Sequence, residues 1–153
     1  MYKKILLFIL LFIGLFTLTA CSNKRTYKCS KDDNDPDFKI ERITKVELKG
    51  KKITKYYIIA KEKFDDKKSF EKACTNLADY YKKERAEGKK KYKSKVECSK
   101  LRKQVLITKT YDVSKYKSIE QIDNLGIQKY TNDDFTFDKK GWIKEHKEND
   151  YKC

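Results

Sequence analysis

The sequence predicts an α+β fold: an antiparallel sheet of about four to five strands, one long amphipathic helix packed on a face, and a short C-terminal helix. The segment 38–48 alternates polar and apolar residues, and the neighbouring segment 53–64 is rich in Ile and Tyr. A segment with apolar residues three and four positions apart follows them, and a second pair of expected strands comes after it. Alternation is typical of half-buried strands, and the longer spacing is typical of an amphipathic helix. The order strand, strand, helix, strand, strand favours a sheet covered by a helix.

The chain opens the predicted sheet with a short strand and then a long one. Residues 26–30 predict the short strand, and an acidic loop follows at 31–37, where Pro36 breaks regular structure. The alternation over 38–48 has one exception, Ile43. One parity holds Phe38, Ile40, Val46 and Leu48, and the other holds Lys39, Glu41, Lys45, Glu47 and Lys49.

A hairpin and a long helix make up the middle of the chain. A turn at Gly50-Lys51 joins the strand 38–48 to a partner strand, 53–64, which is rich in Ile and Tyr. Asp65 or Asp66 then caps a helix that ends near Gly88. The residues expected on its core side are Phe70, Ala73, Cys74, Leu77, Tyr80 and Tyr81.

The second hairpin and the C-terminal segment complete the expected fold. Residues 92–100 and 101–113 predict two strands, the second with Val105, Ile107, Tyr111 and Val113 at alternate positions. Residues 118–130 fit no single pattern. A short helix is expected to begin near Asp138, with Trp142 and Ile143 as its apolar anchors.

The first 20 residues predict an export signal. Lys3 and Lys4 precede an almost wholly apolar run at 5–18, and small residues follow it. Because this run is shorter than the roughly 20 residues of a membrane-spanning helix, a cleaved signal is favoured over a lasting span. We therefore divide the chain into a signal at 1–20, a tether at 21–25 and a single α+β domain at 26–153.

The stretch Leu18-Thr19-Ala20-Cys21 resembles the lipobox of bacterial lipoproteins, in which the signal is cut before a cysteine that carries a diacylglyceryl group. The resemblance implies that Cys21 is the lipidated amino terminus of an exported protein held at the outer side of the cell membrane. Two acyl chains anchor a protein stably where one does not. The alternative is an ordinary signal peptide that happens to end at a cysteine.

Charge points to an anionic partner. The formal net charge is +15, and loss of Lys3 and Lys4 with the signal leaves +13. Such an excess favours anionic lipid, anionic wall polymer or nucleic acid, and export argues against nucleic acid. The densest basic run lies at 82–95, where a solvated helix end and loop is the alternative explanation. The candidate contacts are Lys24, Arg25, Lys89, Lys90, Lys91 and Lys93.

The cysteine count supports the same division of the chain. Five cysteines are an odd number for an exported protein, and assigning Cys21 to lipid leaves four, which can pair in three ways. Structural disulfides are favoured over free thiols, and the absence of a Cys-x-x-Cys motif disfavours a zinc site. Because Cys74 and Cys98 lie in the helix and a neighbouring strand, we expect them to pair. Cys29 and Cys153, near the two ends of the domain, then form the second bridge.

Element order gives a family resemblance. A lipobox, an opening strand with a tyrosine, a long hairpin, one amphipathic helix and a second hairpin ending in "YDVSKY" resemble the small bacterial lipoproteins of the YehR-like family. The likeness spans about Thr26 to Lys117. It implies the α+β fold and the lipid anchor, and it implies no catalytic residue because that family has no settled role. The four cysteines after Cys21 and the Trp142 segment depart from it.

No residue pattern predicts a reaction centre, a cofactor or a metal site. His146 is the only histidine, and the sequence has no recognisable nucleophile motif for which it could act as the base. We therefore expect His146 to be a solvated residue of the C-terminal helix. Asp33, Asp35 and Asp37 have the first spacing of an EF-hand loop, but Phe38 replaces its glycine and Thr44 its glutamate. An irregular calcium site is the weaker alternative to a solvated acidic turn.

Two classes of function remain. The first is a membrane-anchored envelope lipoprotein without catalysis, which binds anionic lipid, a wall polymer or another envelope protein. The second is an envelope hydrolase that works through scattered carboxylates. A cleft that holds two convergent carboxylates would favour the enzyme, and a smooth or shallow surface would favour the binding protein.

Overall fold

The computed structural model describes residues 23–34, 38–86 and 92–153. Within them the chain forms five strands, two α-helices and three short 3₁₀ segments. The elements are β1 (Lys24–Asn34), β2 (Phe38–Lys49), β3 (Lys52–Phe64), α2 (Lys67–Ala86), β4 (Tyr92–Ser99), β5 (Gln104–Asp112), η1 (Val113–Lys115), η2 (Ile119–Leu125), η3 (Gln128–Tyr130) and α3 (Lys139–Glu148).

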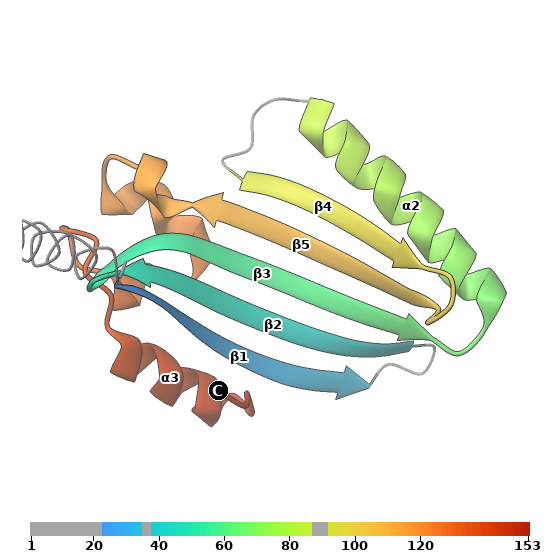
Figure 1. Cartoon of the computed structure of the whole chain (residues 1–153), viewed down its shortest axis with the longest axis horizontal. Helices are drawn as coiled ribbons and strands as arrows, with labels where there is room; N and C mark the ends of the chain where they lie inside the picture. The colour runs from blue at the N-terminus through green and yellow to red at the C-terminus, as the bar shows by residue number, and fades with distance from the viewer. Residues whose placement is uncertain (1–22, 35–37, 87–91) are drawn as a thin grey trace, which may run out of the picture.

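The five strands form one antiparallel sheet in the order β1-β2-β3-β5-β4. The chain leaves β3 through α2, returns as β4 at the far edge, and turns back as β5 between β3 and β4 (Figure 1). Helix α2 lies along the β4 margin of the sheet and α3 along the β1 margin (Figure 1). The predicted α+β class with an antiparallel sheet is confirmed.

The turn between β2 and β3 needs the glycine that the sequence supplies. Gly50 has φ +65°, a left-handed conformation that costs a side-chain-bearing residue free energy. Beyond the turn, the register of β2 and β3 shifts between Glu47 and Leu48. The hydroxyl of Thr54 donates to the backbone oxygen of Glu47 at 3.0 Å. This irregularity keeps Ile53 and Leu48, both buried, on one face of the sheet.

Helix α2 packs on the β5 and β4 side of the sheet. Its first turn is capped as expected, because Asp66 Oδ1 accepts a hydrogen bond from Ser69 N at 2.8 Å. Phe70 and Tyr81 of the helix are buried against Val105 and Ile107 of β5. Tyr80, expected on the core side, is 55% exposed, because the helix turns Tyr81 inward in its place.

Helix α3 packs at the other margin of the same face. Asp138 caps it, accepting from Gly141 N at 3.1 Å, so the predicted start of this helix is confirmed. Trp142 is fully buried in a core with Cys29 and Val46. After the helix, Lys152 exchanges two backbone hydrogen bonds with Ser30 on the outer edge of β1, at 2.8 and 2.7 Å.

Two disulfides tie the helical segments to the sheet. Cys29 of β1 is bonded to Cys153, and Cys74 of α2 is bonded to Cys98 of β4. The expectation of structural disulfides is confirmed, and the pairs are those that element placement favoured. Both bridges cross from a sheet margin to the segment that covers it.

Several expected boundaries were wrong. The first strand runs to Asn34 instead of Ser30, because 31–34 pair with 39–42 of β2 and so are not part of a loop. Lys24 and Arg25, expected in the tether, are the first residues of β1. Strand β5 ends at Asp112, so Val113 belongs to a 3₁₀ turn. The ambiguous segment 118–130 contributes η2 and η3, and the expected helix end at Gly88 lies outside the described residues.

Candidate functional site: the uncovered face of the sheet

Both helices cover the same face of the sheet. Side chains alternate between the two faces of a strand, so directly paired residues of neighbouring strands share a face. The row Tyr27, Val46, Tyr56, Tyr111 and Tyr92 crosses all five strands on the side of the helices. The buried residues that α2 and α3 contact belong to this face, which we call the helix face.

The opposite side, the open face, is built from the intervening residues. Neither core formed by the described residues includes its apolar side chains Ile43, Ile59 and Leu106. From β1 toward β4 the rows of the open face are Thr26, Glu47, Lys55, Asp112; Lys28, Lys45, Tyr57, Thr110, Lys93; Ser30, Ile43, Ile59, Thr108, Lys95; Asp32, Glu41, Lys61, Leu106, Glu97; and Lys39, Lys63, Gln104, Ser99.

A short apolar strip lies in the middle of the open face. Ile43 is directly opposite Ile59, and Leu106 is the diagonal neighbour of Ile59 on the adjoining strand. These side chains are half-buried by their neighbours within the sheet, since no described helix packs over them. These three side chains keep part of their surface accessible to a partner that contacts the open face.

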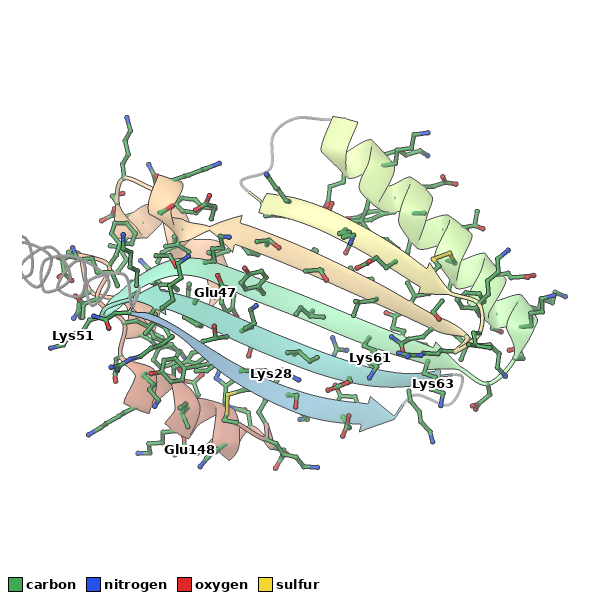
Figure 2. The ribbon with its side chains drawn as sticks, viewed as in Figure 1. Lys28, Glu47, Lys51, Lys61, Lys63 and Glu148 are labelled. Carbon is green, nitrogen blue, oxygen red and sulfur yellow. A yellow bond between two sulfur atoms is a disulfide. The ribbon has the colours of Figure 1, made fainter. Side chains whose placement is uncertain are left out.

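Lysines surround the apolar strip. Lys28, Lys45 and Lys93 share one row across the sheet, and Lys39 lies directly opposite Lys63. Figure 2 shows labelled Lys28, Glu47, Lys61 and Lys63 spread over β1, β2 and β3. The lysines therefore extend over the length and breadth of this face and are not confined to one end.

Some of these lysines are neutralised by neighbours and others are not. Lys45 pairs with Glu47 at 3.0 Å and Lys61 with Glu41 at 3.0 Å, and Lys95 pairs with Glu97 at 2.8 Å. Ion pairs at a protein surface contribute only about 0 to 1 kcal/mol each. The open-face lysines that make no ion pair within 4.0 Å in the described part of the chain are Lys24, Lys28, Lys39, Lys49, Lys55, Lys63 and Lys93.

Tyr57, Glu47 and Lys45 form a polar cluster in the open-face rows next to the strip. The hydroxyl of Tyr57 donates to Glu47 Oε1 at 2.9 Å, and the Nζ of Lys45 lies 4.1 Å from the centre of the Tyr57 ring. Burial raises the pKa of Tyr57 to about 12, and Glu47 acts in the same direction. Burial also opposes ionisation of Glu47, but hydrogen bonds from Lys45 and Tyr57 outweigh it and lower the pKa of this carboxyl. Glu47 therefore stays a carboxylate that holds Lys45 in place.

Among the described residues, two carboxylates that line one hollow beside the helix face bear on the hydrolase hypothesis. Asp33 and Glu145 line the same hollow of about 460 Å³, beside His146. Asp33 accepts from Arg42 Nε at 2.7 Å, and Glu145 accepts from Lys129 Nζ at 2.5 Å and from the Tyr130 hydroxyl. These hydrogen bonds lower the pKa of Glu145, whereas a glycosidase acid needs a carboxyl with a raised pKa.

The pKa of Glu62 is shifted in the opposite direction from that of Glu145, and Glu62 lies elsewhere on the helix face. Burial raises the pKa of this carboxyl, and Arg42 opposes the shift. Glu62 lies on β3, two strands from Asp33 along their shared row, and it does not line the hollow beside His146. The carboxyl with the raised pKa therefore lies outside the hollow that holds Asp33 and Glu145.

The expectation of a solvated His146 was wrong. Its ring is half-buried between α3 and the sheet, with Trp142 and Tyr151 as ring neighbours at 4.3 and 4.9 Å between centroids. Nδ1–H donates to the backbone oxygen of Trp142 at 2.9 Å, and Nε2 lies 3.0 Å from Thr44 Oγ1. Removal from water lowers the pKa of His146, and the bond to Trp142 opposes this shift. These contacts give His146 a packing role.

The structure separates the other expected site residues. Lys24 and Lys93 lie on the open face, at the two edge strands, and Arg25 lies on the helix face. Cys21, the signal and tether sequences up to residue 22, and Lys89, Lys90 and Lys91 lie outside the described residues. The lysines of the open face were not predicted as one surface, because no local sequence pattern shows that both helices cover the same side of the sheet.

The acidic segment that resembled a calcium loop begins in strand β1. Asp33 belongs to β1 and pairs with Arg42, while Asp35 and Asp37 lie outside the described residues. Across 23–34, 38–86 and 92–153, no three His, Cys, Asp or Glu residues are grouped to hold a metal ion. In the same ranges no helix has both the length and the apolar character to span a membrane.

Comparison with known proteins supports the fold alone. The chain is similar to the NMR structure of a protein from Streptococcus pneumoniae TIGR4, with a TM-score of 0.54 and 14% sequence identity. The match covers 84% of each chain. No protein-family model matches the sequence, and no curated protein matches it.

Proposed function

We propose that this protein is an exported, membrane-anchored binding protein without catalysis, and that its open face holds an anionic polymer of the cell envelope. The observation that carries the proposal is the arrangement of the helices. Both cover one face of the sheet, and the other face presents lysines that form no ion pair with the described residues, around the apolar strip Ile43, Ile59 and Leu106.

The dimensions of the open face suit a linear partner. Five strands about 4.8 Å apart place Lys28 and Lys93, at the two ends of one row, roughly 19 Å from each other. Lys39 and Lys63 lie toward the other end of the strands. A polymer with regularly spaced negative charges can contact several of these lysines at once, so weak single contacts add up to useful affinity.

The predicted anchor supports a polymer over the lipid surface as the partner. Only Ser22 and Asn23 separate Cys21 from the start of β1, so an extended tether reaches at most about 11 Å. The end of the sheet at Lys24 then lies near the bilayer, while strands of up to 13 residues carry the face away from it. The lipobox and the resemblance to YehR-like lipoproteins are the basis for this anchor.

A salt series tests the proposal. A soluble protein of residues 22–153 contains every described strand, helix and disulfide. It is titrated separately with a purified anionic wall polymer, a neutral polysaccharide and anionic liposomes. We expect saturable binding to the anionic polymer that weakens as salt rises, because salt screens exposed charges. Absence of polymer binding at low salt contradicts the proposal, and tighter binding to liposomes than to polymer assigns the face to the membrane instead.

A further inference from the structure

A pocket opens at the anchored end of the open face. It encloses about 450 Å³ where β3 begins, β5 ends and β4 begins. Three lysines from separate elements line it: Lys55 of β3, Lys93 of β4 and Lys115 of η1. One carboxylate, Asp112, lies among them. The pocket is therefore concave, cationic and continuous with the surface assigned to the polymer.

The charges in the pocket do not cancel. Asp112 accepts from the hydroxyl of Ser114 at 2.6 Å and pairs with Lys115 at 3.6 Å. The bond from Ser114 lowers the pKa of Asp112, burial opposes it, and Lys115 and then Lys55, which is directly opposite Asp112 on β3, reinforce the lowering, so this carboxylate stays ionised and balances one of the three lysine charges. Lys55 and Lys93 form no ion pair within 4.0 Å with any described residue. The pocket thus has an excess of about two positive charges.

We propose that this pocket binds the phosphate end group of a polyol phosphate, with Lys55 and Lys93 as its charge partners. A phosphate monoester carries about −1.5 to −2 at neutral pH, which matches the excess. Lysine is a common phosphate ligand because its ammonium is a compact charge with three donors. The inference rests on the proposed function, since it assigns the end group of the polymer that the open face holds.

The rest of the pocket fits the polyol that carries the phosphate. The rings of Tyr92 and Tyr116 supply apolar walls, and Thr110 supplies a hydroxyl. The side-chain oxygen of Gln121 accepts from Lys117 N at 3.0 Å, and its NH₂ group takes no part in that bond. A ligand that is anionic at one end and hydroxylated along its body meets a matching group on each side.

Binding of glycerol 3-phosphate to the full chain tests this pocket. Equilibrium binding is compared with that of glycerol and of phosphatidylglycerol vesicles, whose lipids carry a diester with a single negative charge. We expect saturable binding of glycerol 3-phosphate, none of glycerol, and weaker binding of the vesicles. The double change Lys55→Gln and Lys93→Gln should weaken glycerol 3-phosphate binding by about tenfold or more, because two charge-assisted contacts are lost.

A matched control separates the pocket from general charge. Lys28→Gln with Lys39→Gln removes the same charge from the open face outside the pocket, and it should change glycerol 3-phosphate affinity by less than about threefold, because salt screens distant charges. Equal weakening by both double changes overturns the pocket, as does unchanged affinity in the Lys55 and Lys93 variant. Tighter binding of vesicles than of glycerol 3-phosphate also overturns it, in favour of a lipid headgroup.

The same variants distinguish this inference from the proposed function. If the polymer still binds but glycerol 3-phosphate does not, the pocket assignment fails and the binding function stands. If glycerol 3-phosphate binds through Lys55 and Lys93 while the polymer does not bind, the pocket assignment stands and the polymer function fails.

Discussion

The Nε2 atom of His146 lies 3.0 Å from the hydroxyl oxygen of Thr44, and this contact joins helix α3 to a central part of strand β2. Because Nδ1 donates to the backbone oxygen of Trp142, the neutral ring accepts the Thr44 hydrogen through Nε2. The ring is also packed between Trp142 and Tyr151. The single histidine therefore fastens the C-terminal helix to the sheet in its neutral form.

Because His146 is packed in its neutral form, we expect the protein to lose stability on mild acidification. Removal from water holds the pKa of His146 below its ordinary value of 6.5, so the unfolded chain binds the proton more readily than the folded chain. The free energy of unfolding should then fall as pH decreases below about 6.5 toward the lowered folded value. His146→Gln should flatten the pH dependence between about pH 7.5 and pH 5, measured by urea unfolding. An unchanged slope in this variant would show that other groups cause it.

The carboxylates do not account for a difference between the parent and the His146→Gln variant in the pH dependence of the free energy of unfolding. The lowered pKa values of Glu145 and Asp112 move their titration further into acid, away from this pH window. The raised pKa of Glu62 acts in the opposite sense, because its contribution to stability increases as pH falls, but it is present in both proteins.

The two disulfides should differ in their contribution to stability. In the chain-entropy account the stabilisation grows with the length of the closed loop. Cys29 and Cys153 are 124 residues apart, and Cys74 and Cys98 are 24 residues apart. Replacing both cysteines of a pair with serine should cost about 5 kcal/mol for the long loop and about 3.5 kcal/mol for the short one. Urea unfolding measures both, and a larger loss at Cys74 and Cys98 contradicts the expectation.

The indole of Trp142 supports the whole C-terminal segment through its packing. Its side chain is fully buried beside Phe137, with ring centroids 5.9 Å apart. Trp142→Ala should cost about 3 to 5 kcal/mol because a large cavity remains. The buried Nε1 has no hydrogen-bond partner in the described part of the protein, so Trp142→Phe leaves no donor or acceptor stranded and should cost clearly less. Equal losses in urea unfolding would show that Nε1–H makes a stabilising contact.

Much of the fold follows from residue patterns. The alternation in 38–48 places Val46 and Leu48 on the buried side, where the structure has them. Asp138 and Gly50 act at the cap and turn expected of their residue types. The end of the first strand was missed because the polar residues at 31–34 form part of an edge strand, where pairing with β2 outweighs low strand propensity.

The candidate site was much less predictable. Ile43 broke the alternation of its strand, and its position opposite Ile59 shows why: it belongs to the apolar strip of the open face. Recognising that strip requires knowing that α2 and α3 lie on the same side, which depends on tertiary packing of Phe70 and Trp142. The position of His146 against Thr44, 102 residues away in the chain, has no local signal for the same reason.

Charge reversal on one face at a time tests the central claim most directly. The open-face variant carries Lys28→Glu, Lys39→Glu and Lys63→Glu, at exposed lysines outside the pocket. The control carries Lys68→Glu, Lys72→Glu and Lys140→Glu, at exposed lysines of the two helices. Both variants change the net charge by the same amount.

The measurement is the affinity of each variant for the anionic wall polymer over a salt series. Each basic group near an anionic partner contributes on the order of 1 kcal/mol, so the open-face variant should lose at least about tenfold in affinity and show a shallower salt dependence. The control should stay within about threefold of the parent, because its lysines lie away from the open face. Equal losses in the two variants, or no loss in the open-face variant, would contradict the assignment of the open face as the binding surface.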